Sequence, residues 1–515
     1  MIKYPIGIQN FESLRREGYA YVDKTAMVWR LANYGRYYFL SRPRRFGKSL
    51  LLSTIEAYME GKRELFDGLA IAELEKEWKK YPILHLDLNA KQYKDSDDLL
   101  KILNMHLERW ENNYGDKYKD RDPEERFFHI IEQAYQQTGM PLVILVDEYD
   151  KPMVLNLDNE PLQDEFRSIL KAFYGVMKSA DRYIKLGFLT GVPKFSKVSA
   201  FSDLNNLDDI SMQRDYITAC GLTEQEIHDN FDSRVGELAE ACGMTKEECY
   251  AEMKKRYDGY HFSENSVGMY NPFSVLNTLS KKAFGDYWFA TGTPTLMVKL
   301  LQTTSFNLYN IVDTPVTADL LGRVDSMKEN PLPVIYQSGY LTIKGYDREF
   351  REYQLGFPNQ EVESGFINYL LPIYTNAQQP SAMFSINQFV REVRNGRPEA
   401  FMTRLQAMMA DTDYRIVGET ELYFQNFLFV FFRLLGLYVE VERATSDGRT
   451  DMIVQTKDYI YIFEFKLDRS ADEALRQIED KGYARPFAAD ARHLYKIGVN
   501  FSSEKRCVEE YRIEC

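Results

Sequence analysis

The chain has 515 residues, of which 44% are hydrophobic and 27% are charged, and its formal net charge is −13. This length allows about two to four domains with full hydrophobic cores. The acidic balance argues against a protein that coats nucleic acid non-specifically, because such a protein needs a broad basic surface, although a local basic groove is still allowed.

The N-terminal segment, residues 1–18, lacks the apolar core of a signal peptide. No run in the chain reaches the roughly 18 apolar residues that span a bilayer, and the five cysteines lack the spacing of a metal site. These features predict a cytoplasmic protein with free thiols and no membrane partner. Further along, Asp23 precedes a helical pattern at 26–33, where it either caps the helix or borders an adenine pocket.

An apolar run at 37–40 leads through a basic loop into Gly47-Lys48-Ser49 and an apolar helical pattern. This order is typical of a phosphate-binding loop, in which backbone N–H groups at a helix N-terminus surround phosphate oxygens. We expect Lys48 to reach the β- and γ-phosphates of ATP and the Ser49 hydroxyl to ligate Mg²⁺. Arg42 stands where the P-loop pattern has its first glycine. The predicted cofactor-binding residues of this segment are Arg44, Arg45, Phe46, Gly47, Lys48, Ser49 and Leu50, where Arg44 and Arg45 either contact phosphates or merely cover the loop.

Apolar strands alternate with helical patterns in the next part of the chain. The strands are predicted at 82–88, 141–146 and 183–189, and the helices at 96–114, 124–138 and 160–179. This alternation predicts a parallel three-layer α/β sheet with its ligand at the carboxyl ends of the strands.

The strand at 141–146 is apolar throughout, as in a strand buried on both faces of a sheet, and it ends in Asp147-Glu148. We expect Asp147 to hold Mg²⁺ through water and Glu148 to polarise the attacking water. Thr190 ends the next predicted strand. In ATPases of the additional-strand type a polar residue there lies beside the γ-phosphate, although an ordinary turn explains a Thr-Gly pair equally well.

The middle of the chain has a different character. Residues 222–256 are helical and charged, which suits a lid over the nucleotide. Residues 294–357 alternate short helices with a predicted two-stranded wing at 339–344 and 352–355, as in a winged-helix module. The pattern breaks at 376–385, where we expect a linker.

A second cluster of charged residues lies on a predicted hairpin between 448 and 466. Because alternate residues of a strand share a face, Glu464 and Lys466 project together while Phe465 points into the core. Asp451, on the adjacent strand, can converge with Glu464 on a site for Mg²⁺ or Mn²⁺, and Lys466 can orient or help deprotonate the attacking water. This is the chemistry of phosphodiester hydrolysis; the alternative is an amphipathic hairpin with exposed charges.

Two flanking helices add candidates to this site. Glu421 begins the apolar helix 422–435 and is a further candidate ligand of the same metal. The helix 471–482 places Gln477 and Lys481 one turn apart, which suits a phosphate or the attacking water.

With both halves in view, the chain resembles a bacterial family of uncharacterised proteins with an AAA-ATPase-like N-terminal domain and a C-terminal PD-(D/E)xK nuclease-like domain. The resemblance covers nearly the whole chain. In that family the loop also reads Arg-Pro-Arg-Arg-Phe-Gly-Lys-Ser, so Arg42 matches a family trait. The segments that carry the resemblance are 21–25, 41–49, 146–150, 190–192, 257–260, 271–272, 291–294, 338–342, 448–451, 464–466, 477–478 and 482–483.

The resemblance implies two sites. The residues implied to bind and hydrolyse ATP are Lys48, Ser49, Asp147 and Glu148. The residues implied to cleave nucleic acid with a metal are Asp451, Glu464 and Lys466, with Glu421 and Gln477 as weaker matches.

The predicted fold class is therefore α/β. It comprises an N-terminal P-loop ATPase three-layer sandwich with a helical lid, a middle helical or winged-helix-like region, and a C-terminal PD-(D/E)xK restriction-endonuclease-like α/β domain. The predicted boundaries are 1–215 for the AAA-like core, 216–293 for the lid, 294–375 for the winged-helix-like module, 376–414 for a helical linker and 415–515 for the nuclease-like domain.

Three functions follow from this layout. The first is an ATPase whose nucleotide state controls a Mg²⁺-dependent nuclease acting on foreign or mobile DNA. The second is a nucleotide-operated interaction switch whose C-terminal domain binds nucleic acid without cutting it. The third is an ATP-binding protein without turnover, because Arg42 narrows the loop. All three have ATP as a partner and allow a homo-oligomer.

Overall fold

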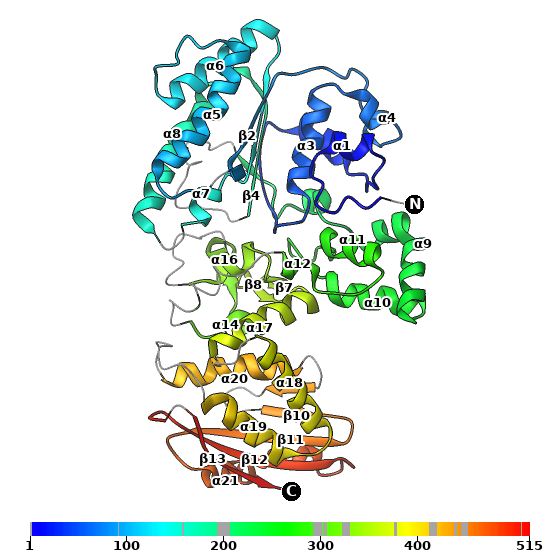
Figure 1. The fold of residues 1–515 in the computed structure, drawn as a ribbon, viewed down its shortest axis with the longest axis vertical. Coiled ribbons are helices and arrows are strands. Elements are labelled where there is room, and N and C mark those ends of the chain that lie inside the picture. Colours follow the sequence, from blue (N-terminus) through cyan, green and yellow to red (C-terminus); the bar gives the residue numbers. More distant parts are fainter. Residues whose placement is uncertain are drawn as a thin grey trace. The chain divides into compact units, whose positions relative to one another are not determined.

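The computed structural model describes residues 3–90, 92–156, 159–192, 207–291, 301, 306–308, 310–321, 330–374, 379–410, 420–436, 440–443, 452–505 and 507–515. The chain forms two units (Figure 1). The first comprises Met1–Thr291 and Thr314–Asn359, and the second comprises Gly292–Asp313 and Gln360–Cys515. Each predicted domain is one continuous range of residues, whereas each of these two units combines two separate ranges.

A parallel sheet forms the centre of the first unit. Its strands are β1 (Tyr37–Ser41), β2 (Ile83–Asp87), β3 (Leu142–Asp147), β4 (Ile184–Gly191) and β5 (Asp208–Asp209). They lie in the order β2-β3-β4-β1-β5, and every neighbouring pair is parallel. β4 therefore separates β1 from β3, and the carboxyl ends of all three strands meet at one edge. The predicted parallel α/β sheet is confirmed.

Helices cover both faces of this sheet. They are α1 (Phe11–Arg16), α2 (Thr25–Tyr34), α3 (Lys48–Met59), α4 (Ile71–Leu74), α5 (Ser96–Tyr114), α6 (Pro123–Thr138), α7 (Lys151–Val154) and α8 (Glu160–Ser179). α5, α6 and α8 lie on one face, and α1 and α3 lie on the other (Figure 1). α5 and α6 are joined by a buried ion pair, in which Arg126 Nε lies 2.7 Å from Glu111 Oε1.

A helical segment follows the sheet within the first unit, made of α9 (Glu224–Cys242), α10 (Lys246–Tyr257), α11 (Pro272–Lys281) and α12 (Tyr287–Ala290). α9 and α10 each begin with a capping box, in which Thr223 pairs with Glu226 and Thr245 with Glu248. α9, α10 and α11 pack on a common core that includes Phe231. The helices predicted over 222–256 are present.

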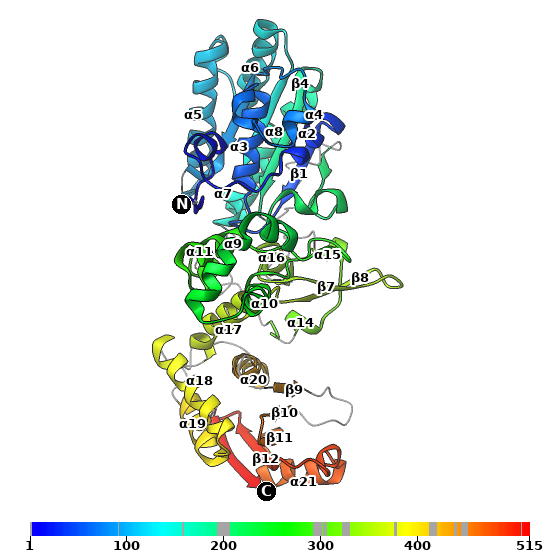
Figure 2. The same cartoon turned by 90° about the vertical axis from the view of Figure 1, so that its right-hand side faces the viewer.

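A small antiparallel sheet in the order β6-β8-β7 completes this unit. Its elements are β6 (Val316–Thr317), α15 (Ala318–Leu321), α16 (Leu332–Gln337), β7 (Thr342–Asp347) and β8 (Glu352–Gly356). The β7–β8 hairpin projects from the other elements of the unit (Figure 2). It matches the predicted pair of strands, but the first strand begins at Thr342 rather than at residue 339. Gly339 has φ 88° and its N–H bonds Tyr336, so residues 338–340 end α16 instead of extending the strand.

The second unit contains a mixed sheet in the order β13-β12-β11-β10-β9, in which only β11 and β12 pair in parallel. Its elements are α14 (Asn310–Asp313), α17 (Gln360–Tyr374), α18 (Gln379–Arg394), α19 (Pro398–Ala410), α20 (Thr420–Gly436), β9 (Glu440–Arg443), β10 (Met452–Gln455), β11 (Tyr459–Leu467), α21 (Ala471–Lys481), β12 (His493–Ser502) and β13 (Cys507–Glu514). Part of the linker predicted at 376–385 is helical, because α18 begins at Gln379 and accommodates Pro380 in its first turn.

The two faces of β11 carry different side chains. Phe463 and Phe465 pack on Phe432 of α20, with ring centroids 5.8 and 6.0 Å from it. Ile460 and Ile462 on the other face pack against α21. The alternation predicted for this strand is present, and it places Glu464 and Lys466 on the α21 side. Among the described helices, none is long and apolar enough to cross a bilayer.

Candidate nucleotide and nuclease sites

The loop between β1 and α3 curls around Lys48. The lysine Nζ donates hydrogen bonds to the carbonyl oxygens of Arg42 at 2.9 Å and Pro43 at 3.3 Å, and the residue is 5% exposed. Gly47 has φ 100°, a region that favours glycine, and a Cβ built there meets nothing within 4 Å. Ser49 follows in the first turn of α3 and is half-buried. An open loop that leads into a helix N-terminus in this way fits a phosphate group.

Each arginine of the loop lies over an aromatic ring from a later segment of the same unit. Such contacts are attractive because the ring face carries partial negative charge. The pairs are Arg42 with Phe262 at 4.0 Å, Arg44 with Trp288 at 4.8 Å, and Arg45 with Phe273 at 5.0 Å. The Trp288 Nε1–H also donates to the Arg44 carbonyl at 3.0 Å. The loop is thus braced by residues that follow it by more than 200 positions.

Arg42 is the residue that departs from the P-loop pattern, and its guanidinium is buried, with 1% of the residue exposed. It donates to the carbonyl oxygens of Ser41 at 2.8 Å, Ser211 at 2.7 Å and Tyr216 at 3.3 Å. Burial lowers the pKa of Arg42 to about 10. The arginine thus links the loop to the segment after β5.

The acidic end of β3 lies beside the end of β4. The Thr190 hydroxyl donates to Asp147 Oδ1 at 2.7 Å, and both residues are buried. The Glu148 N–H bonds the same oxygen at 3.1 Å, and Glu148 has φ 54°, a left-handed conformation that is uncommon outside glycine. Thr190 pairs with Leu40 of β1 in the sheet. Thr190 therefore lies in a strand between the loop and the acidic pair, rather than in a turn.

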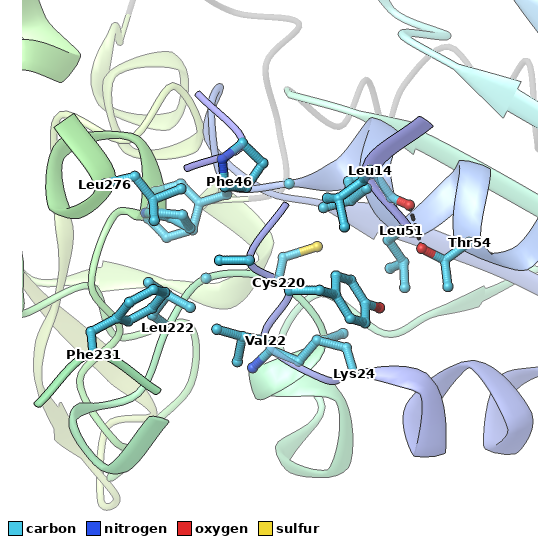
Figure 3. Close-up of a pocket in the computed structure, with 18 residues that line it drawn as sticks. Leu14, Val22, Lys24, Phe46, Leu51, Thr54, Cys220, Leu222, Phe231 and Leu276 are labelled. Carbon is cyan, nitrogen blue, oxygen red and sulfur yellow. Dashed lines mark hydrogen bonds between the residues drawn. The ribbon is translucent and has the colours of Figure 1, made fainter. Parts of the chain in front are cut away.

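A cavity of about 100 Å³ is lined in part by Phe46 and Gly47 of the loop (Figure 3). Figure 3 shows Phe46, Leu222 and Phe231 on one side of it and Leu51 and Thr54 on the other, with Cys220 between them. The lining residues come from the segment before α2, from the loop and α3, from residues 219–222, and from α9 and α11. They include Tyr21, Val22, Lys24, Gly47 and Leu50.

Asp23 does not line this cavity in the described part of the chain. Its Oδ1 accepts hydrogen bonds from the Thr25 N–H at 2.8 Å and the Thr25 hydroxyl at 2.7 Å, so it fixes the start of α2. Its neighbour Lys24 lines the cavity and forms an ion pair with Glu226 of α9, with Nζ 2.5 Å from Oε1. Asp23 thus bonds the first residue of α2 from the position before the N-cap, Lys24, and does not border the cavity.

The C-terminal cluster is built from one strand and one helix. The Lys466 Nζ donates to Glu464 Oε1 at 2.9 Å and to Gln477 Oε1 at 2.7 Å. Glu464 is 1% exposed. The Gln477 amide in turn bonds the Tyr483 hydroxyl at 3.5 Å. Sequence analysis missed Tyr483 as a site residue; it follows Gly482, the left-handed residue that ends α21.

The close packing of α21 on the sheet explains this convergence. Gly498 of β12 pairs with Glu464 of β11, and a Cβ at Gly498 would lie 2.4 Å from the Ala471 carbonyl. Only glycine at this position leaves room for the first turn of α21. The helix begins at the Ser470 cap and ends at Gly482, so its Gln477 faces Lys466.

The structure describes no side chain for two predicted metal ligands. Asp451 directly precedes β10, whose first residue Met452 pairs with Phe463, the neighbour of Glu464. Glu421 lies in the first turn of α20, but its side chain is not described. Among the described residues, no three His, Cys, Asp or Glu side chains gather as a metal site. The oxygen atoms of Glu464 and Gln477 nevertheless belong to the hard donors that Mg²⁺ and Mn²⁺ prefer.

Comparison with known proteins also separates an N-terminal from a C-terminal domain. A family of predicted AAA-ATPases matches residues 5–201, and the PD-(D/E)XK nuclease superfamily matches residues 419–511. The chain is also 35% identical over 522 residues to an uncharacterised protein in the vnfD 5′ region of Azotobacter chroococcum mcd 1, and the alignment covers 99% of each chain. The chain belongs to the predicted AAA-ATPases that carry a C-terminal PD-(D/E)XK nuclease domain.

This family membership places both clusters within matched domains. In this predicted AAA-ATPase, the first match contains the loop at Lys48, Asp147 and Thr190. The second match contains Glu464, Lys466 and Gln477. The arrangement of an N-terminal ATPase-like domain and a C-terminal nuclease-like domain, predicted from the sequence, is confirmed.

Proposed function

We propose that this predicted AAA-ATPase binds and hydrolyses ATP, and that its nucleotide state regulates a Mg²⁺-dependent nuclease that acts on foreign or mobile DNA. The observation that supports this proposal is that one chain holds two separate polar clusters, each within a matched domain. The first comprises Asp147 and Thr190, which are hydrogen-bonded at the ends of β3 and β4, and Lys48, which begins α3 after the loop that follows β1. The second gathers Glu464, Lys466 and Gln477.

The nucleotide site follows from the loop and the cavity. The backbone N–H groups at the start of α3 and Lys48 bind the β- and γ-phosphates, and the nucleobase occupies the cavity between Tyr21, Phe46 and Phe231. Ser49 and Asp147 hold Mg²⁺, which neutralises phosphate charge. Glu148 orients and polarises the attacking water.

Thr190 senses the γ-phosphate from the end of β4, between the loop and the acidic pair. Its hydroxyl already bonds Asp147. A shift of Thr190 toward the phosphate would therefore change this hydrogen bond to Asp147, the proposed Mg²⁺ ligand. Arg44 and Arg45 stabilise the loop through Trp288 and Phe273 rather than by contacting phosphate.

The nuclease site follows from β11 and α21. Glu464 and Asp451, with Glu421 as a further ligand, would hold Mg²⁺ or Mn²⁺, which as a Lewis acid would polarise the phosphodiester for hydrolysis. Lys466 orients the attacking water and favours its deprotonation, and Gln477 holds the ammonium in place.

A second function is favoured by one observation. Lys466 is already bonded to both Glu464 and Gln477, and Glu464 is 1% exposed. A carboxylate that is neutralised in this way binds a cation less readily, because the ammonium already balances its charge. The chain would then be a nucleotide-operated switch whose C-terminal domain binds nucleic acid without cleaving it.

The experiment that separates these functions uses plasmid DNA with Mg²⁺ or Mn²⁺, with and without ATP. Nicking that depends on metal, responds to ATP and is lost in Lys466→Ala supports the regulated nuclease. A mobility shift without nicking supports the switch. ATP turnover is followed in the same tubes, with Lys48→Ala as the variant expected to lose it. ATP binding without turnover in the wild type would support the nucleotide-binding protein that does not hydrolyse ATP.

A further inference from the structure

A buried carboxyl lies just beyond the acidic pair of β3 and has no role in the proposed ATP site. Asp150 is 1% exposed. Its Oδ2 accepts a hydrogen bond from the Val192 N–H at 3.2 Å. Its Oδ1 has no hydrogen-bond partner among the described residues. A buried carboxyl with an unsatisfied oxygen costs stability, so its retention calls for a physical reason.

The Val192 peptide connects Asp150 to the phosphate loop. The Val192 carbonyl accepts a hydrogen bond from the hydroxyl of Ser41, the last residue of β1 before the loop. The Tyr149 N–H donates to the Thr190 carbonyl at 3.1 Å, which fixes the same strand two residues earlier. A continuous set of hydrogen bonds therefore runs from the end of β3, across the end of β4, to the end of β1.

Close packing shows that this connection is tight. A Cβ built on Gly191 would lie 2.3 Å from Asp150 Oδ1 and 2.6 Å from the Tyr149 ring. Real Cβ contacts of that length do not occur, so any side chain at position 191 must displace Asp150 or Tyr149. Glycine here is required by the approach of Asp150 to β4.

The charge state of Asp150 suits a connecting role. Burial and the neighbouring Glu148 raise its pKa to about 8, while Lys48 acts in the opposite direction. The buried Tyr174 of α8 interacts electrostatically with the same carboxyl. At neutral pH the group is therefore mainly protonated, and it bonds Val192 without placing a second negative charge beside Glu148.

We propose that Asp150 is a positioning residue for ATP hydrolysis, which holds the ends of β3, β4 and β1 together so that Glu148 and Thr190 face the phosphate loop. This inference rests on the proposed function of the N-terminal domain. Asp150 touches neither ATP nor Mg²⁺ in this scheme. It acts through Val192 and Ser41.

The test compares Asp150→Ala, Asp150→Asn and Gly191→Ala in the full-length protein, with Gly175→Ala as the matched control. A Cβ at Gly175 in α8 meets nothing within 4 Å. Asp150→Ala and Gly191→Ala should lower kcat for ATP by about 10- to 100-fold with little change in KM, because misplacement of about 1 Å at a reacting centre costs rate on this scale. Asp150→Asn keeps the neutral acceptor and should retain nearly full kcat. Gly175→Ala should match the wild type.

Hydrogen exchange gives a readout that needs no turnover. The amide of Val192 should exchange faster in Asp150→Ala than in the wild type, and Asp150→Asn should restore its protection. Wild-type kcat in both Asp150→Ala and Gly191→Ala would overturn the positioning role and leave the proposed function intact. A wild type that hydrolyses ATP no faster than Lys48→Ala would overturn the proposed function, and the positioning role with it.

Discussion

The two candidate sites differ in how far apart along the chain their residues lie. Lys466 and Gln477, which bond each other, are 11 positions apart. Trp288 and Arg44, which bond across the phosphate loop, are 244 positions apart. The first site is therefore fixed by one strand and one helix, whereas the second depends on the packing of a remote segment.

This difference has a consequence for regulation. A cluster made from neighbouring elements keeps its geometry as long as β11 and α21 stay packed. The phosphate loop is instead held by aromatic rings at 262, 273 and 288, so a movement of that segment changes the loop directly. We therefore expect substitutions in the C-terminal cluster to leave the first unit unchanged, and substitutions in the loop arginines to lower the stability of the first unit.

The largest expected effect is on nicking activity, and it concerns Lys466 of the C-terminal cluster. Lys466→Ala should lower metal-dependent nicking of plasmid by about 100- to 1,000-fold, because it removes a charged donor placed at the reacting centre. ATP turnover should not change, since Lys466 has no contact with the N-terminal site among the described residues. The matched control is Lys457→Ala, whose lysine is exposed in the β10–β11 turn. Full nicking activity in Lys466→Ala would remove Lys466 from the catalytic site.

The second-largest effect is on the stability of the first unit, and it concerns Arg42 of the phosphate loop. Arg42→Gly brings the loop closer to the P-loop pattern, yet it removes three hydrogen bonds to backbone carbonyls and the contact with Phe262. We expect a loss of about 2–4 kcal/mol of stability, because the carbonyls lose their buried donor. The four tryptophans all lie in the first unit, so the urea midpoint of their fluorescence reports this change.

Arg45→Ala is the matched control for this substitution. Arg45 is exposed, and its contact with Phe273 is worth about 0.5–1 kcal/mol. Equal midpoints for Arg42→Gly and the wild type would show that the loop does not depend on its remote support.

The sequence predicted the local elements of both domains well, for a physical reason. The helix expected at 96–114 is α5, Ser96–Tyr114, because Asp95 caps its first turn and the apolar residues repeat at helical spacing. The pairing of Glu464 with Lys466 follows equally from strand alternation, and the structure shows it. Signals of this kind lie within a few residues of the feature that they predict.

The sequence could not predict the contacts that cross the chain. The role of Arg42 depends on its contacts with Ser211, Tyr216 and Phe262. No pattern in a single sequence indicates that these residues contact Arg42. Phe46 was predicted to bind the cofactor; its ring lines the cavity but also packs on Tyr260 at 4.8 Å. The metal set at the nuclease site stays a prediction, since Asp451 lies outside the described residues.

A smaller effect concerns the pH dependence of stability in the N-terminal unit. The pKa of Asp150 rises to about 8 from an ordinary value of 3.8. Between these values the unfolded chain has released a proton that the folded chain keeps, so stability falls as pH rises from about 4 to about 8 and then levels off. Asp150→Asn removes this contribution. Its tryptophan-reported stability should therefore gain about 1–2 kcal/mol relative to the wild type between pH 6 and pH 8, measured in EDTA so that no metal shifts the titration. Parallel pH profiles for the two proteins would contradict a protonated Asp150.

The smallest effect tests whether the C-terminal cluster is formed by β11 and α21 alone. Gln477→Ala removes the hydrogen bond that holds Lys466 toward Glu464, but it leaves both charges in place. Nicking should fall by about tenfold, which corresponds to one lost hydrogen bond to a charged group. Tyr483→Phe, which removes only the hydroxyl behind Gln477, should have a still weaker effect in the same direction. A larger loss in Tyr483→Phe than in Gln477→Ala would mean that the tyrosine contacts the substrate itself, and that the site extends beyond β11 and α21.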